Sequence, residues 1–289
     1  MRWKGRKQSR NVIDSRGKGS RGGGKKAISG VGIVVALVAI FIFNQAPEQV
    51  LNDLVSQGQS QTSSEPRELT AAEREMGEFV GVVLRDTEAV WEEIFQMQFD
   101  RSYQQPQLEM FSGRVDTACG TQSSAVGPFY CPGDYRIYLD TSFFQEMETR
   151  LNAPGDFAQA YVIAHEVGHH VQKLIGVSDK VSQQRARSNK VEANRLSVRQ
   201  ELQADYFAGV WAHHAQRRYQ YLEPGDIEEA LNAANAIGDD KLQKQARGVV
   251  VPDSFTHGTS AQRIKWFKLG FQSGDIRAHD PFKLPYSQL

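Results

Sequence analysis

Apolar residues recur every three or four positions along much of the chain, which is the period of an amphipathic helix. Two long stretches, residues 70–97 and 190–219, show this period most clearly. The same pattern predicts shorter helices over 142–151, 156–176, 226–238 and 261–270. Residues 135–139 are typical of a short strand, and the polar residues 178–188 are expected to connect two helices. We therefore predict an α+β domain over residues 70–289 that is mostly helical and has one small β element.

Capping residues support two of these helix starts. Thr70 followed by Glu73 matches the capping box, in which each side chain bonds the other residue's backbone N–H. Asp156 is predicted to cap the next long helix.

An uncharged apolar run, residues 27–43, precedes this domain and is just long enough to cross a bilayer. A cleavable signal peptide is the alternative, but residues 44–46 make a poor cleavage site. The sequence predicts a single transmembrane helix over 27–43, followed by a flexible polar linker over 44–69. The N-terminal tail would then lie in the cytoplasm and the domain outside it, with the membrane as a partner.

Charge is distributed unevenly along the chain, although the total is zero. Residues 1–26 hold ten Lys or Arg and one Asp, a net charge of +9 that leaves −9 for the rest. A mildly acidic body is not typical of a nucleic-acid-binding enzyme. Membrane topology and attraction to anionic lipid explain the basic tail more simply than a nucleic acid does. We therefore expect no nucleic-acid partner.

The chain has two cysteines, Cys119 and Cys131, on either side of a loop that contains Gly, Ser and Pro. Outside the cytoplasm they are expected to form a disulfide, worth roughly 3 kcal/mol for a loop of this size. Two unpaired thiols are the alternative. A metal site on cysteine is disfavoured because no Cys-x-x-Cys spacing occurs.

The strongest chemical signal is the H-E-x-x-H run formed by His165, Glu166 and His169. Residues four apart in a helix lie on one face, so both imidazoles can bind one Zn²⁺. Glu166 is then placed beside the metal-bound water, where a general base is required. Two surface histidines beside a helical glutamate would be the alternative.

A third protein ligand is expected, because catalytic zinc usually binds three protein groups and keeps one open position. Glu201 is the best candidate, and Asp205, one helical turn later, is suited to accept a hydrogen bond from a ligand imidazole. His257 competes as the third ligand, and we predict instead that it donates to the developing oxyanion. Arg263 is expected to hold the His257 loop or a substrate carboxylate.

These residue types predict peptide-bond hydrolysis. Zinc lowers the pKa of its bound water and polarises the scissile carbonyl, while Glu166 carries the proton to the leaving amine. By analogy with other enzymes, the strand at 135–139 is predicted to pair with an extended substrate.

Several runs together resemble the bacterial neutral zinc metallopeptidases of the YpfJ type. They are the run from His165 to Gln172, the run from Glu201 to Asp205, the opening residues 1–6, residues 225–232 and residues 257–263. The resemblance spans nearly the whole chain. It implies a zincin-like hydrolase anchored in the bacterial inner membrane, with an extracytoplasmic domain that binds one catalytic Zn²⁺. Tyr206 departs from the family, in which Cys often stands at this position, and is expected to alter packing alone.

Two other functions fit parts of the pattern. A protein that keeps zinc only for stability would be a binding or scaffold protein of the cell envelope, and it would have no need of Glu166. A zinc hydrolase acting on a cell-wall amide would use the same residues. The predicted function remains an endopeptidase that acts on peptide or protein substrates.

Overall fold

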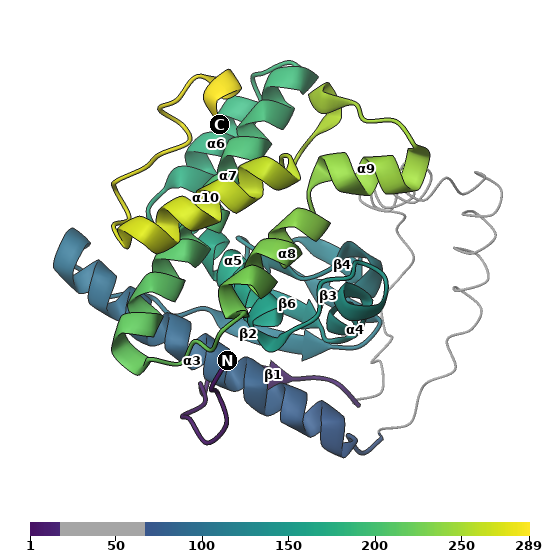
Figure 1. The fold of residues 1–289 in the computed structure, drawn as a ribbon, viewed down its shortest axis with the longest axis vertical. Coiled ribbons are helices and arrows are strands. Elements are labelled where there is room, and N and C mark those ends of the chain that lie inside the picture. Colours follow the sequence, from purple (N-terminus) through teal and green to yellow (C-terminus); the bar gives the residue numbers. More distant parts are fainter. Residues whose placement is uncertain (18–66) are drawn as a thin grey trace.

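The structure is a computed structural model that describes residues 1–17 and 67–289, and in these residues it contains eleven helical segments and two small sheets. In these residues the α-helices are α3 (Ala71–Phe99), α4 (Ser142–Thr149), α5 (Asp156–Leu174), α6 (Val177–Arg185), α7 (Lys190–Tyr219), α8 (Asp226–Ala236), α9 (Asp239–Arg247) and α10 (Ser260–Ser273). Short 3₁₀ turns occur at η1 (Ser124–Val126), η2 (Pro252–Ser254) and η3 (Tyr286–Gln288). The sheet lies on one side of α5, and α7 with α10 lies on the other (Figure 1). The predicted α-rich α+β domain is confirmed.

Side-chain caps fix the starts of the long helices. The predicted capping box of Thr70 and Glu73 opens α3, and Asn189 caps α7 through the backbone N–H of Glu192. Asp156 does not cap α5, because Gly155 is the N-cap residue and makes no side-chain bond. The polar stretch expected to connect two helices contains α6, which buries only Val181.

The larger sheet has four strands in the order β1-β2-β6-β5, formed by Val12–Asp14, Gln107–Phe111, Arg136–Asp140 and Phe129–Cys131. The first three run parallel, and β5 is antiparallel to β6 at one edge. The strand predicted at 135–139 is thus β6, which is paired on both sides. A substrate cannot pair with β6, so that part of the prediction is wrong.

A separate hairpin is formed by β3 (Arg114–Thr117) and β4 (Gly120–Ser123). Cys119 lies in its turn, and a disulfide joins it to Cys131 at the end of β5. Cys131 is fully buried and packs with Phe111 and Tyr138. The bond therefore ties the hairpin to the edge strand.

The main core lies where α7 meets α5 and α10. Large rings fill it, among them Tyr161, Trp211 and Trp266, all fully buried. The α7–α10 crossing depends on two glycines, since a Cβ at Gly209 would collide with the carbonyl oxygen of Phe267 and one at Gly270 with backbone of α7. The core thus holds together the helices that carry the predicted site.

Residues 1–17, which we call the arm, are part of this folded body. Strand β1 extends the sheet, pairing Val12 with Leu108 of β2. The Met1 ammonium lies 2.6 Å from Asp156 Oδ1 and 3.2 Å from Asp226 Oδ1, at the first residues of α5 and α8. The prediction that residues 1–26 form a separate basic tail is therefore wrong for the arm.

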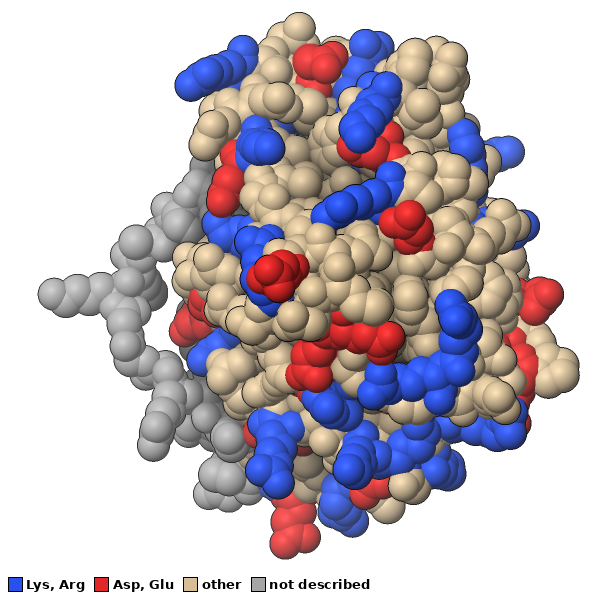
Figure 2. Space-filling view, turned by 90° about the vertical axis from the view of Figure 1, so that its left-hand side faces the viewer, with Lys and Arg blue, Asp and Glu red and all other residues tan. Residues whose placement is uncertain are grey.

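The arm's basic residues find acidic partners in the domain. Arg6 Nη2 lies 2.7 Å from Asp86 Oδ1 in α3, and Lys4 Nζ lies 2.6 Å from Glu75 Oε1. On the face to the left in Figure 1, Lys and Arg side chains gather over the lower part, with Asp and Glu side chains among them (Figure 2). Acidic residues of the domain thus partly balance the positive charge of the arm.

The predicted membrane topology is also wrong. None of the helices in residues 1–17 and 67–289 has both the length and the apolar character needed to span a bilayer. The predicted span, residues 27–43, lies outside the described residues, as does most of the predicted linker. The arm and the domain pack together, so they cannot lie on opposite sides of a membrane as a single span between them requires.

Candidate metal centre

Helices α5 and α7 cross closely and carry the residues of the H-E-x-x-H run and its downstream partners. Gly168 makes the crossing possible, because a Cβ there would come 2.9 Å from the Ala204 carbonyl oxygen. His165 and His169 on α5 therefore face Glu201 on α7. The glycine inside the run thus has a packing role of its own.

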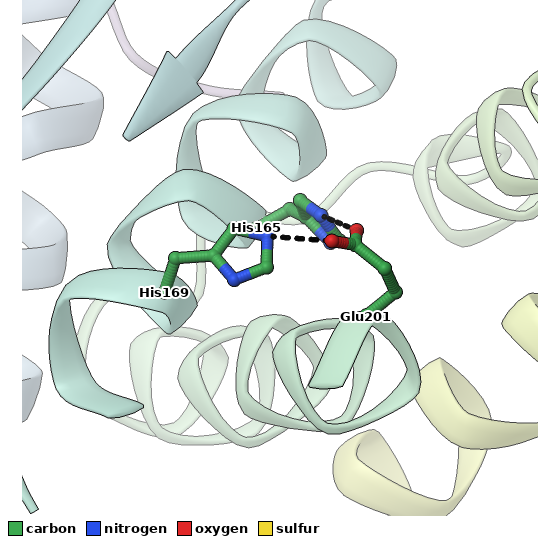
Figure 3. A group of neighbouring side chains, drawn as sticks. All are labelled: His165, His169 and Glu201. Atoms are coloured by element: carbon green, nitrogen blue, oxygen red, sulfur yellow. Dashed lines mark hydrogen bonds and ion pairs between the residues drawn. The ribbon is translucent and has the colours of Figure 1, made fainter. Parts of the chain in front are cut away.

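The structure brings His165, His169 and Glu201 together. One ligand atom from each lies within 4.8 Å of the others. Both imidazoles point at the carboxylate (Figure 3), with His165 Nε2 3.1 Å from Glu201 Oε2 and His169 Nε2 3.5 Å from Oε1. Two atoms bound to one tetrahedral Zn²⁺ at about 2.1 Å would lie roughly 3.4 Å apart, so the three residues fit a zinc ion.

The other nitrogen of each imidazole has an acceptor, which fixes the tautomers. His165 Nδ1 lies 2.8 Å from Asp205 Oδ1, as the sequence predicted for Asp205. His169 Nδ1 lies 2.9 Å from Gln172 Oε1, while the Gln172 amide donates to the Gln200 carbonyl oxygen. With Nδ1–H donating in both rings, both Nε2 atoms are directed at Glu201, and a neutral ring would offer its Nε2 lone pair to a metal ion. The three groups are thus arranged so that one cation could bind all of them.

The electrostatics lead to the same conclusion. Burial alone would lower the pKa of both imidazoles, but Glu201 raises the pKa of His169 to about 9, and Asp205 together with Glu201 raises that of His165. Burial would raise the pKa of Glu201, yet the two imidazoles hold it well below its usual range. The carboxylate is thus ionised, and the site attracts positive charge.

Glu166 is buried, with 7% of its surface exposed. Within the described residues its carboxylate accepts no hydrogen bond and forms no ion pair. Burial raises its pKa, despite the opposing effect of His169 and His165. A carboxylate beside the three ligand candidates that has no partner in this part of the chain is available to a water molecule or a substrate.

His257 lies apart from the three ligand candidates, on the loop before α10, and its side chain is half exposed. Its Nδ1 lies 3.2 Å from Asp239 Oδ1. The other oxygen of Asp239 accepts the backbone N–H groups of Thr256, His257 and Gly258. Asp239 therefore fixes both the loop and the orientation of the imidazole.

Sequence analysis predicted no role for two residues of this site, Gln172 and Tyr161, and did not predict the partner of a third, Arg263. Gln172 follows His169 by three positions and Tyr161 precedes His165 by four, so helical spacing could have identified both. Tyr161 donates its hydroxyl to Asp205 Oδ1 at 2.5 Å. Arg263, which was expected to hold the His257 loop or a substrate carboxylate, pairs with Asp205. Asp205 and Arg263 are 58 residues apart, so spacing gave no signal.

Two imidazoles and a carboxylate on crossed helices, with a free carboxylate beside them, are typical of mononuclear metal-dependent hydrolases. The model of the family described as "Putative neutral zinc metallopeptidase" matches residues 1–282. The chain belongs to this family.

Relatives match along much of the chain. The YpfJ protein of Escherichia coli K12 is 50% identical over 279 residues, which cover 95% of this chain and 96% of that protein. The Rv2575 protein of Mycobacterium tuberculosis is 46% identical over 205 residues, which cover 68% of this chain and 67% of that protein. No solved structure matches significantly.

Proposed function

We propose that the protein hydrolyses peptide bonds with one zinc ion held by His165, His169 and Glu201. The main support is the pair of imidazole Nε2 atoms directed at one carboxylate, with both Nδ1 atoms engaged by acceptors. When bound, zinc would act as a Lewis acid toward the scissile carbonyl and lower the pKa of a water ligand.

Glu166 is the general base of this proposal. Its carboxylate has no protein partner in the described part of the chain, and burial favours its uptake of a proton. It would accept the proton of the attacking water and give it to the leaving amine. A protein that held zinc only for stability would have no use for such a group.

His257 is the proposed donor to the oxyanion of the tetrahedral intermediate. Asp239 holds its Nδ1, which leaves Nε2 free to donate when the ring is protonated. The hydrogen bond to Asp239 and the charges of Glu201 and Asp239 raise the pKa of His257 and so favour the protonated ring.

Strand β5 is the proposed binding edge for an extended substrate. One side of β5 pairs with β6, and among residues 1–17 and 67–289 no strand pairs with its other side. The Tyr130 hydroxyl in this strand lies 3.1 Å from Nδ1 of His170, and His170 directly follows the ligand candidate His169. Backbone pairing at this edge would recognise unfolded or extended peptides. Methylating backbone nitrogens of a substrate peptide should then raise KM.

The decisive experiment compares Glu166→Gln with the unaltered full chain. Zinc content is measured by elemental mass spectrometry, and cleavage is measured on a peptide library. We expect Glu166→Gln to keep one zinc per chain and to cleave about 100- to 10,000-fold more slowly. Glu146→Gln, the same change at an exposed position in α4, is the control. Equal cleavage by Glu166→Gln and the unaltered chain would refute the mechanism.

A further inference from the structure

Asp205 is the most heavily engaged carboxylate of the site. Its Oδ1 accepts from Tyr161, His165 and Arg263, and its Oδ2 accepts from Arg263 Nε at 2.9 Å. The donors come from α5 and α10, on both sides of α7. All four residues are at least nine-tenths buried. Orienting the His165 imidazole requires only one of these hydrogen bonds, so the others serve to hold Asp205 itself.

Arg263 makes the most contacts in this network. Nε and Nη2 grip the two oxygens of Asp205 at 2.9 and 3.0 Å, a two-point contact that only a guanidinium provides. Nη2 also lies 3.2 Å from the Tyr161 hydroxyl. The guanidinium thus fixes the plane of the carboxylate that the His165 ring follows.

The same guanidinium also contacts the segment that supports the His257 loop. Its Nη1 lies 3.4 Å from the carbonyl oxygen of Ile237, two residues before the Asp239 that holds the His257 loop. Gly238 lies between them and packs directly on Ser260, at the start of α10. Arg263 therefore contacts both the support of the metal ligands and the segment that supports His257.

We infer that Arg263 is a positioning residue: by fixing Asp205, it fixes the orientation of the His165 imidazole relative to the His257 loop. Tyr161 assists it by donating to the same carboxylate. The inference rests on the proposed metal site and adds a specific dependence to it. A carboxylate held on both oxygens cannot rotate, so the Nε2 lone pair of His165 keeps its direction before any cation arrives. Groups that orient metal ligands typically change metal affinity about 10- to 100-fold when they are removed.

The test measures metal binding by the purified full chain, without any substrate. Co²⁺ is used as the probe because its visible absorption reports coordination geometry, and Zn²⁺ affinity is obtained by chelator competition. The variants are Arg263→Met, Arg263→Lys and Tyr161→Phe. Lys265→Met, which removes an exposed charge from the same helix, is the control.

We expect Arg263→Met to weaken Zn²⁺ binding about 10- to 100-fold and to change the Co²⁺ spectrum. Arg263→Lys restores the charge but not the two-point grip, so it should recover only part of the affinity. Tyr161→Phe should weaken binding less than Arg263→Met. Lys265→Met should bind as the unaltered chain does. A purely structural role would lower thermal stability and leave the affinity of the folded fraction unchanged.

Two outcomes separate this inference from the proposed function. If the unaltered chain binds neither metal, the proposed metal site itself is wrong. If it binds both while Arg263→Met is folded and matches it in affinity and spectrum, the positioning role is refuted and the site stands. Should Arg263→Met fail to fold, unchanged affinity in both Arg263→Lys and Tyr161→Phe refutes the role.

Discussion

Breaking the disulfide between Cys119 and Cys131 tests how firmly the hairpin and the edge strand belong to the cooperative fold. Cys119 is exposed and Cys131 is fully buried, so Cys119→Ser removes the cross-link and leaves the buried sulfur in place. The two cysteines are 12 residues apart. The loss of loop-closure entropy for a loop of this size predicts a destabilisation of about 3 kcal/mol. In a domain of this size that corresponds to a Tm lower by about 6–12 °C.

The assay is urea unfolding followed by tryptophan fluorescence, since Trp91, Trp211 and Trp266 are all buried in the main core. The unaltered chain with reductant should unfold at the midpoint of Cys119→Ser, and without reductant at a higher urea concentration. The slope of the free energy against urea should rise without the cross-link, because the unfolded chain exposes more surface. A loss below about 1 kcal/mol would contradict the reasoning. The hairpin would then unfold separately from the core that the tryptophans report.

Three further outcomes follow from packing, burial and binding. Gly209→Ala should destabilise the protein by several kcal/mol or prevent folding, because the new methyl group collides with the Phe267 carbonyl oxygen; urea midpoints measure this. Burial raises the pKa of Asp86 to about 7 despite its pairing with Arg6, so the folded state binds that proton more tightly than the unfolded state. Stability should therefore fall as pH rises from about 4 to 7, and Asp86→Asn should flatten that slope in unfolding curves recorded across the range. Removing zinc with a chelator should lower Tm, and adding zinc back should restore it, since an ion that binds only the folded state stabilises it; a Tm insensitive to both treatments would count against the site.

The helices could be predicted from the sequence wherever an apolar stripe and a cap coincide. The long helix predicted at 190–219 agrees with α7, and the capping box at Thr70 opens α3 as expected. Helix α6 was missed because nearly all its residues are polar or exposed. Strands β1 to β5 were missed because they have three to five residues and show little alternation.

The residues of the candidate site also differ in whether a local sequence pattern could predict them. His165, Glu166 and His169 follow from spacing within one helix, and Glu201 with Asp205 follows from spacing within another. The contact of Arg263 with Asp205 joins two helices and has no local pattern. The arm was misjudged for a similar reason, because the acids that balance it, such as Asp86 and Glu75, lie on α3. A run of positive charge looks like a solvated tail until the fold shows where its partners are.

These distant contacts explain why α5 can present two imidazoles in a fixed geometry. At its first residue, Asp156 is held by the Met1 ammonium of the arm. In its middle, Gly168 lets the backbone rest against Ala204 of α7. One turn later, Gln172 bonds both His169 and the backbone of α7. Segments remote in sequence thus contact α5 at three positions along its length. The helix cannot rotate or slide without breaking several of these contacts. The proposed site is therefore preorganised by the fold, and binding a metal ion would require little rearrangement of the helices.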